Sequence, residues 1–177
     1  MKSPEELLRA QLFQRRIVFL RGPLDDAAAG DVAAQLMTLD ASGDEAVQLH
    51  VDSPGGPLEP AFVLIDTIGL LGVRVHAVCV GRAEGAAVGV LAAAEVRGAA
   101  PHARFRLSQP DEKVGGVARD IETWVAHKQR LLDDFHRSLA TATGRPLEQV
   151  EADTAAGRYL DAAEAVAYGL VHEVWTR

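Results

Sequence analysis

The apolar residues along the chain follow two different spacings. In some segments they recur every three to four residues, as on one face of a helix, and in others they form the short unbroken runs typical of buried strands. Helical spacing is found at residues 4–15, 26–39, 59–71, 85–95, 117–143 and 147–152, and in a last segment between Asp161 and Gly169. Short apolar runs are found at 17–20, 47–51, 73–80, 104–107 and 170–175. Strands and helices thus alternate without tight hairpins, which predicts an α/β fold with a mostly parallel sheet covered by helices.

The segment 117–143 is the unusual element of this pattern. At about 1.5 Å per residue, a helix of this length spans roughly 40 Å, more than a domain of this size needs for its own core. Its apolar positions at helical spacing are Trp124, Leu131, Leu132, Phe135 and Leu139. Two interpretations stay open: the helix packs within the subunit, or its far end contacts another subunit through the first four of these residues.

The composition is that of a globular domain, and it excludes several classes of function. Hydrophobic residues make up 48% of the chain and charged residues 24%, and 177 residues is the length of one domain. A formal net charge of −7 without any Lys/Arg-rich run argues against a nucleic-acid-binding surface. Charged residues interrupt the most apolar region, 73–96, and the N-terminus lacks a signal peptide's apolar stretch. We therefore expect a cytoplasmic protein without a membrane partner.

The chain offers little for cysteine or metal chemistry. Cys79 is the single cysteine and lies in an apolar run, which predicts a small buried side chain rather than a reactive thiol. The six histidines are scattered, with no His-x-x-x-His pair. We expect neither a metal site nor a cofactor.

A turn from strand to helix, Gly81 to Ala87, is the most informative segment of the chain. Such a turn directs backbone N–H groups and the positive end of the helix dipole at whatever lies there. Serine hydrolases often place an activated hydroxyl at this point, but here the residue is Gly85. The setting for a nucleophile is present without the nucleophile.

A second turn, Ser53-Pro54-Gly55-Gly56, also follows a predicted strand. Its two glycines let the backbone approach a ligand closely, with N–H groups that form a nest for anions or half of an oxyanion hole. Taken alone, the turn is equally an ordinary strand-to-helix connection. Together with the turn at Gly85 it favours a shared cleft at the carboxyl ends of the strands, with Gly55, Gly56 and Ala86 as oxyanion-hole-like donors.

Several motifs resemble those of the proteolytic subunit of Clp protease (ClpP), a family of serine peptidases within the ClpP/crotonase superfold. In matching order and spacing they are RIVFLRGPLDD at 16–26, SPGG at 53–56, QP at 109–110 and AAEAVAYGLV at 162–171. The resemblance extends from residue 16 to residue 174. It implies a spiral of repeated β-α-β units with a long protruding handle helix. The chain would then be a single ClpP-like domain, 1–177, with an N-terminal helix at 1–15, a head at 16–116 and 144–177, and the handle at 117–143.

The chain departs from the family pattern at all three positions of the catalytic triad. Gly85 replaces the nucleophilic serine of Gly-x-Ala-Ala-Ser, and Ser108 replaces the histidine of His-Gln-Pro. The orienting aspartate stands before Arg-Phe/Tyr-Leu in the family, and here Gly157 precedes Arg158-Tyr159-Leu160. Because a triad acts as one unit, losing one member lowers the rate by orders of magnitude. We expect a catalytically inactive ring component with a structural or regulatory role in an ATP-dependent proteolytic assembly.

Two other functions stay open. One is a serine endopeptidase with a non-standard nucleophile, for which Ser108 is the candidate, with Lys113 as a conceivable base in a charged turn. The other is a crotonase-type protein that binds acyl-CoA through backbone N–H groups, with Glu84 or Glu59 as a base. The detailed motifs match the peptidase branch, which argues against the crotonase-type alternative.

The resemblance also implies partners. Family members form rings, so we expect a heptamer or tetradecamer of this chain, or a mixed ring with an active paralogue. An AAA+ ATPase is a further expected partner, but two features weaken that docking. Polar Gln48 and His50 replace the aromatics that line the family's docking pocket, and only Met1 to Ser3 precede the first helix where the family has its gate segment.

Overall fold

The computed structural model describes residues 4–110 and 121–176, which fold around one seven-stranded sheet. Its main path is β1 (Ile17–Arg21), β2 (Val47–Ser53), β3 (Val75–Glu84), β4 (Val96–Ala99) and β7 (Glu173–Val174), all parallel. Off this path, β5 (Arg104–Leu107) pairs in parallel with the end of β3, and β6 (Arg158–Asp161) pairs antiparallel with β5. The mixed α/β architecture is that of the ClpP fold, as the motifs imply.

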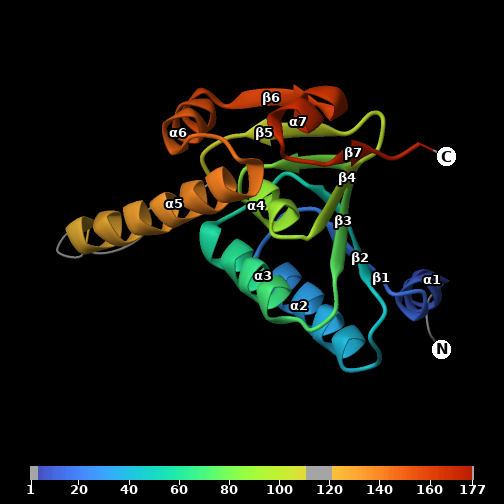
Figure 1. The fold of residues 1–177 in the computed structure, drawn as a ribbon. Coiled ribbons are helices and arrows are strands. Elements are labelled where there is room, and N and C mark those ends of the chain that lie inside the picture. The colour runs from blue at the N-terminus through green and yellow to red at the C-terminus, as the bar shows by residue number, and fades with distance from the viewer. Residues whose placement is uncertain (1–3, 111–120, 177) are drawn as a thin grey trace.

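The helices are α1 (Pro4–Gln14), α2 (Asp26–Asp40), α3 (Leu58–Leu70), α4 (Ala86–Ala92), α5 (Ile121–Thr143), α6 (Leu147–Ala156) and α7 (Ala162–Tyr168). Figure 1 shows α2 and α3 side by side below the sheet, while α1 lies at the other side, next to β1. It also shows α5 projecting away from the rest of the molecule, on the side opposite to both termini.

Local signals position several helix ends as expected. The Asp25 carboxylate accepts a hydrogen bond of 2.8 Å from Ala28 N, which caps α2. Asp161 and Glu164 form a capping box at the start of α7, and Gly169 ends that helix with a left-handed φ of 87°. These short-range interactions need no tertiary information.

Two expectations about elements need correction, and part of a third lies outside the described residues. The sequence pattern missed β4 and β6, because each is four residues long and neither contains an apolar run. The strand expected at 73–80 begins at Val75 and continues to Glu84, because its last residues change partner from β4 to β5. The handle helix is described from Ile121, so its expected first residues, 117–120, lie outside the described residues.

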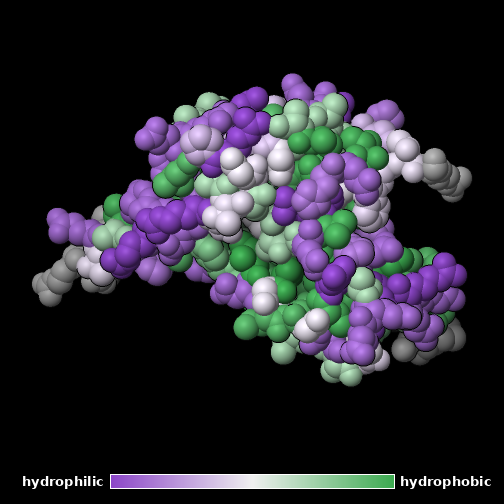
Figure 2. All heavy atoms as spheres, in the orientation of Figure 1, coloured by the Kyte–Doolittle hydropathy of each residue, from purple (hydrophilic) through white to green (hydrophobic). Residues whose placement is uncertain are grey.

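The surface is apolar over part of α2 and α3 and mostly hydrophilic over α5. The exposed apolar side chains on α2 and α3 are Met37, Val63 and Leu70, with 59%, 49% and 86% of their surface exposed. Figure 2 shows hydrophobic residues gathered over this part of the molecule and a mostly hydrophilic α5. None of the helices in the described part of the chain is long and apolar enough to cross a membrane.

Candidate functional site

The turn from β3 to α4 has the geometry that the sequence suggested. Gly85 adopts φ 51° and ψ −125°, a conformation that residues with a side chain rarely adopt. Its N–H donates a hydrogen bond of 3.0 Å to the carbonyl oxygen of Arg106 on β5, which holds the turn against that strand. The turn is therefore a sharp elbow at the carboxyl end of β3.

The glycine-rich turn after β2 lies directly against this elbow. A β-carbon added at Gly55 would stand 2.4 Å from the carbonyl oxygen of Glu84 and 3.3 Å from Ala86 N. One added at Gly56 would stand 2.0 Å from the carbonyl oxygen of Leu24. Both glycines are thus required by close backbone approach. The structure brings together Gly55, Gly56, Gly85 and Ala86, although their roles as oxyanion-hole-like donors stay a prediction.

Ser108 lies at the same elbow. A β-carbon at Gly85 would stand 3.5 Å from Ser108 Oγ, so any side chain at position 85 would point at this hydroxyl. Within the described residues, neither a histidine nor a lysine hydrogen-bonds to Ser108, and the suggested base Lys113 lies outside them. No group on the described part of the chain activates this hydroxyl, and its assignment to the position of the family's base stays a prediction.

Gly157, which the sequence motifs assign to the third position of the triad, lies next to a cation. Gly157 ends α6 with a left-handed φ of 67°, and a β-carbon there would stand 3.5 Å from Arg106 Nη2 and 3.7 Å from Arg106 Nε. The Arg106 guanidinium also lies over the ring of Tyr159, 5.2 Å from its centroid. A guanidinium therefore borders the space that a side chain at position 157 would enter.

The sequence pattern had not singled out Arg106. It lies on β5 two residues before Ser108, which follows the end of that strand at Leu107. This closeness along the chain was the one signal that pointed to Arg106, and its significance depends on where α6 ends.

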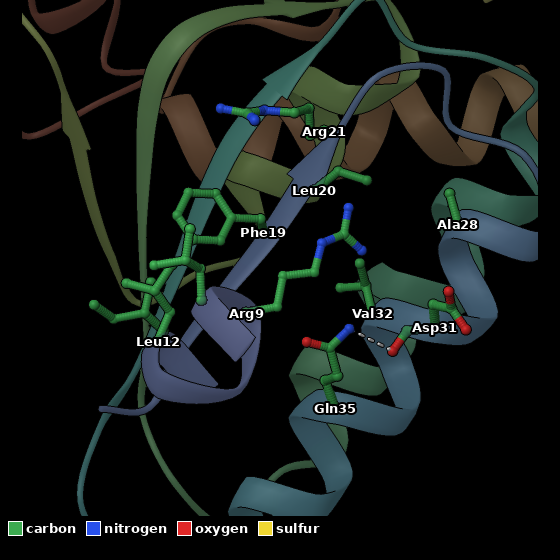
Figure 3. Close-up of a pocket in the computed structure, with 11 residues that line it drawn as sticks. Arg9, Leu12, Phe19, Leu20, Arg21, Ala28, Asp31, Val32 and Gln35 are labelled. Carbon is green, nitrogen blue, oxygen red and sulfur yellow. Dashed lines mark hydrogen bonds between the residues drawn. The ribbon is translucent and has the colours of Figure 1, made fainter. Parts of the chain in front are cut away.

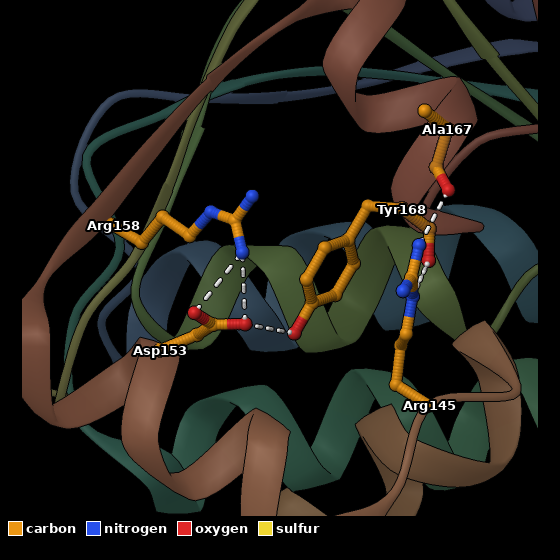
Figure 4. Close-up of polar contacts among 5 residues, drawn as sticks. All are labelled: Arg145, Asp153, Arg158, Ala167 and Tyr168. Carbon is orange, nitrogen blue, oxygen red and sulfur yellow. Dashed lines mark hydrogen bonds and ion pairs between the residues drawn. The ribbon is translucent and has the colours of Figure 1, made fainter.

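A cluster of polar contacts supports the chain on either side of Gly157. Arg158 pairs with Asp153 at 3.1 Å, and the Tyr168 hydroxyl donates a bond of 2.9 Å to the same carboxylate. Figure 4 shows the Tyr168 ring between the guanidinium groups of Arg158 and Arg145. Burial, followed by the Asp153 hydrogen bond, raises the pKa of Tyr168 to about 12. These residues fix the relative position of α6 and α7 and take no part in the cleft.

A cavity of about 220 Å³ opens next to the elbow, between the start of α3 and the helix α5. Pro110 is one of its lining residues, and its Cα would stand 3.9 Å from a β-carbon at Gly85. Its lining residues are Leu58, Gln109, Pro110, Trp124, Val125, Lys128, Gln129 and Leu132. The cavity has apolar walls with polar groups among them, which suits one apolar side chain.

The apolar residues of α5 have different environments. Phe135 is buried within the subunit, with 1% of its surface exposed, and Leu131 and Leu132 pack against the core. Trp124 lines the cavity, and Lys128 Nζ lies 5.7 Å from the centroid of its ring. For Phe135 the intramolecular interpretation is therefore correct, and contact with another subunit stays a prediction for the residues nearer the start of the helix.

The two carboxylates considered as bases for acyl-CoA chemistry are both ion-paired. Glu84 lies 3.7 Å from Arg82, and Glu59 pairs with Lys128 of α5. Partial burial acts to raise the pKa of Glu59, but the hydrogen bonds from Lys128 and from the Glu59 backbone, together with the charges of Lys128 and His127, outweigh it and lower that pKa. A carboxylate with a lowered pKa is a weaker base, which disfavours this role.

The polar pair expected on β2 lies on the partly exposed side of the sheet. His50 Nε2 lies 3.1 Å from Gln48 Oε1, and the His50 ring meets Phe19 of β1 edge-on, with 5.1 Å between centroids. Burial lowers the pKa of His50. Phe19, on the neighbouring strand β1, thus places an aromatic ring beside His50. The sequence motifs had pointed only to Gln48 and His50 of β2 at this surface.

Phe19 also lines a groove of about 380 Å³ at the free edge of the sheet. Figure 3 shows its walls, formed by α1, β1 and α2, with Arg9 reaching between the helices toward Asp31 and Val32. The groove is far from the elbow in the fold and shares none of its residues. In the described part of the chain, no group of three or more His, Cys, Asp or Glu residues is arranged to hold a metal ion.

Comparison with known proteins places these features in context. Residues 4–177 match the family model described as Clp protease. Two curated relatives, from Rhizobium johnstonii and Rhizobium etli, are each described as ATP-dependent Clp protease proteolytic subunit 3. Each is 35% identical to this chain over 169 residues, covering 94% of this chain and 87% of the relative.

Proposed function

The chain belongs to the Clp protease family, and we propose that it serves there as a catalytically inactive, structural or regulatory subunit of an ATP-dependent proteolytic assembly. It is a homologue of the proteolytic subunit. The chain would form a single domain made of an N-terminal helix, a head and a handle, as the motifs imply. Its triad positions would be Gly85, Ser108 and Gly157.

The observation that carries the proposal is the absence of a side chain at the elbow. Gly85 has the conformation and the direction toward Ser108 that a nucleophile would need, but it has no atom that can attack a carbonyl carbon. Gly157 supplies no carboxylate to orient a base, and the guanidinium of Arg106 lies next to it. A cleft with donors but no nucleophile binds an acyl group without cleaving it.

Assembly into rings is the second half of the proposal. Clp protease family members form oligomeric rings. The exposed apolar residues on α2 and α3, and Val125 on α5 with 51% of its surface exposed, are the kind of surface that subunit contacts cover. The ring would be a heptamer or tetradecamer, formed by this chain alone or with an active paralogue, and an ATPase is a further candidate partner.

Intact-mass spectrometry after incubation with a fluorophosphonate probe tests the catalytic half. We expect no adduct under conditions that fully label an active homologue. A stoichiometric adduct would contradict the proposal and favour the alternative with Ser108 as nucleophile. The Ser108→Ala variant would then locate it, because labelling would vanish with that hydroxyl.

Sedimentation velocity tests the assembly half. At tens of micromolar we expect a ring-sized species, either from the chain alone or after mixing with an active paralogue. A monomer under both conditions would exclude the assembly role.

A further inference from the structure

One face of the sheet formed by β3, β5 and β6 carries three arginine side chains. Arg82 of β3 lies beside Arg104 of β5 in the parallel register, and Arg106 lies two residues further along β5. Register partners in a sheet, and alternate residues of one strand, share a face, so the three side chains leave the sheet on the same side. The intervening residues Ala83 and Phe105 are fully buried, which places the arginines on the solvent side. We call the surface of these three residues the arginine face.

The arginine face has little charge compensation of its own. Arg82 lies 3.7 Å from Glu84. Arg104 donates hydrogen bonds to two backbone carbonyl groups, and neither Arg104 nor Arg106 forms an ion pair in the described part of the chain. Asp161 lies opposite Arg104 on β6, but its carboxylate caps α7 by accepting a backbone hydrogen bond of 2.8 Å. Two of the three guanidinium groups therefore have no carboxylate partner, and guanidinium is the group that binds carboxylates best.

Two of these cations start from neighbouring strand positions. Adjacent strands lie about 4.8 Å apart, so the side chains of Arg82 and Arg104 begin at about that separation. Like charges held this close repel each other. The whole chain has a formal net charge of −7, so this grouping of cations does not follow from a basic composition. A ligand with several negative charges over the arginine face would remove the repulsion.

The spacing along β5 indicates which kind of anion fits. Arg104 and Arg106 are two residues apart on a strand, which places their side chains roughly 7 Å apart. Alternate residues of any extended peptide have the same separation, so carboxylates at two such positions can meet both guanidinium groups at once.

The surroundings of the arginine face also favour an extended ligand over a small one. Tyr159 lies opposite Arg106 on β6, at the outer side of β5 (Figure 1), and 63% of its surface is exposed. Its ring lies 5.2 Å from the Arg106 guanidinium and offers an apolar contact beside it. Neither the cavity beside α5 nor the groove at β1 includes these residues, so the arginine face is open. A small anion would be held from one side only, whereas an extended segment contacts several side chains.

We propose that the arginine face binds an extended acidic segment of a partner protein, with carboxylates at alternate positions on Arg104 and Arg106 and another near Arg82. The inference goes beyond the proposed function, because it requires neither a ligand in the cleft nor any catalytic activity. Such a surface would let the subunit recruit a partner by its acidic segment while the rest of the chain, with its negative net charge, repels acidic proteins in general.

The first test compares peptides that differ only in charge. A short fluorescein-labelled peptide that alternates glutamate with threonine is titrated with the full-length protein at low salt, beside the same peptide with glutamine in place of glutamate. Fluorescence anisotropy should show the glutamate peptide binding roughly 10-fold or more tightly, since several charge pairs act together. The difference should shrink in about 0.5 M NaCl, which screens exposed charges. Because the protein is itself negative, equal affinities at low salt would overturn the proposal.

A third peptide tests the alternate spacing. It has the same composition, but its glutamates stand in adjacent pairs separated by two threonines, so that no two of them are two positions apart. We expect it to bind more weakly than the alternating peptide. Equal affinities of these two peptides would refute the extended arrangement on β5.

Variants then assign the binding to particular residues. The double variant Arg104→Gln, Arg106→Gln should lose the preference for the glutamate peptide. The control Arg74→Gln, Arg130→Gln removes two exposed arginines elsewhere, changes the net charge equally and should keep the preference. A preference that persists in the first double variant would refute the assignment. Should that variant not fold, Arg104→Glu, at an exposed position, should abolish the preference by itself.

Two other occupants are distinguished by separate measurements. If inorganic tripolyphosphate binds more tightly than the glutamate peptide in calorimetry, the arginine face recognises phosphoryl groups and the proposal of an acidic segment is wrong. If Arg104→Gln, Arg106→Gln loses a self-association that the wild-type protein shows in sedimentation velocity, the occupant is a second copy and the proposal is equally wrong. Unchanged sedimentation supports a separate partner. A fluorophosphonate adduct would contradict the inactive subunit without changing the peptide comparison, so the two proposals fail separately.

Discussion

The ring of Phe135 on α5 packs directly on Gly89 of α4: a β-carbon added at Gly89 would stand 2.4 Å from Phe135 Cε2. Ile65 of α3 closes the same space at 3.3 Å. The long helix α5 therefore packs against the short helix α4, which follows the elbow.

Gly89→Ala should destabilise the protein by about 1–3 kcal/mol, because Phe135 is buried and has no space into which to move. Gly30→Ala is the matched control: Gly30 is also helical, and a β-carbon there would contact nothing within 4 Å. Since alanine favours a helix over glycine, that control should be stabilised by up to about 1 kcal/mol. Urea unfolding of both variants checks the pair, and equal effects would contradict the packing described.

Arg97 anchors the ends of three helices. Its guanidinium donates to the carbonyl oxygens of Leu170 at 2.9 Å and Ala142 at 2.8 Å, and to Ala92, Ala94 and Gly169 at 3.3 Å. The side chain is buried and its acceptors are backbone carbonyls at helix ends, where the helix dipole is negative.

Arg97→Met should destabilise the fold by about 3 kcal/mol or more, because it leaves several buried carbonyl groups without a donor. Arg74→Met is the control, since its pair with Glu95 is exposed on both sides and should contribute less than about 1 kcal/mol. Thermal and urea unfolding measure the difference. An Arg97→Met variant as stable as the control would show that water replaces the guanidinium freely.

Restoring the nucleophile alone should not restore peptidase activity. Gly85→Ser supplies a hydroxyl within contact of Ser108, but it leaves the base and the orienting carboxylate absent. We expect no hydrolysis of a fluorogenic peptide above the wild-type background. Measurable turnover by this single variant would show that the triad positions have been assigned incorrectly.

Restoring all three triad residues should also be insufficient while Arg106 remains. An aspartate at position 157 would reach the Arg106 guanidinium, since even its β-carbon would stand 3.5 Å from Nη2. That ion pair would compete with the histidine at position 108. We expect little or no peptidase activity from the triple variant Gly85→Ser, Ser108→His, Gly157→Asp. Adding Arg106→Met to it should raise that activity at least 10-fold. The same rate with and without Arg106 would refute the competition.

Histidine burial predicts a loss of stability in mild acid. Burial lowers the pKa of His136, and the nearby carboxylates of Glu151 and Asp133 only partly offset this. The unfolded chain therefore takes up a proton near the ordinary value of about 6.5, whereas the native state resists protonation until a lower pH. The free energy of unfolding should fall as the pH drops through about 6.5, and this contribution should level off below the native pKa.

The comparison that isolates His136 uses urea unfolding at pH 7.5 and pH 5.5. His136→Gln should lose less stability between the two pH values than the wild-type protein does. His102→Gln, at an exposed position, should behave like the wild type. The same loss in all three proteins would assign the acid sensitivity to other groups.

Much of the fold follows from short-range patterns. The alternation of apolar runs with helical spacing and the last helix between Asp161 and Gly169 depend on local patterns, so they were predicted and the structure contains them. The cap at Asp25 is equally local. The strands β4 and β6 have no such pattern, because their hydrogen-bond partners, rather than their own side chains, make them strands.

By itself the sequence determined which residues stand at the elbow and that Gly85 carries no nucleophile, since residue identity needs no coordinates. Only the tertiary structure decided that Arg106, some fifty positions before Gly157, packs against it, and that Phe135 lies inside the subunit. The physical reason is that such contacts depend on strand register and on where helices end. Those features arise from packing between elements distant along the chain, which no local spacing encodes.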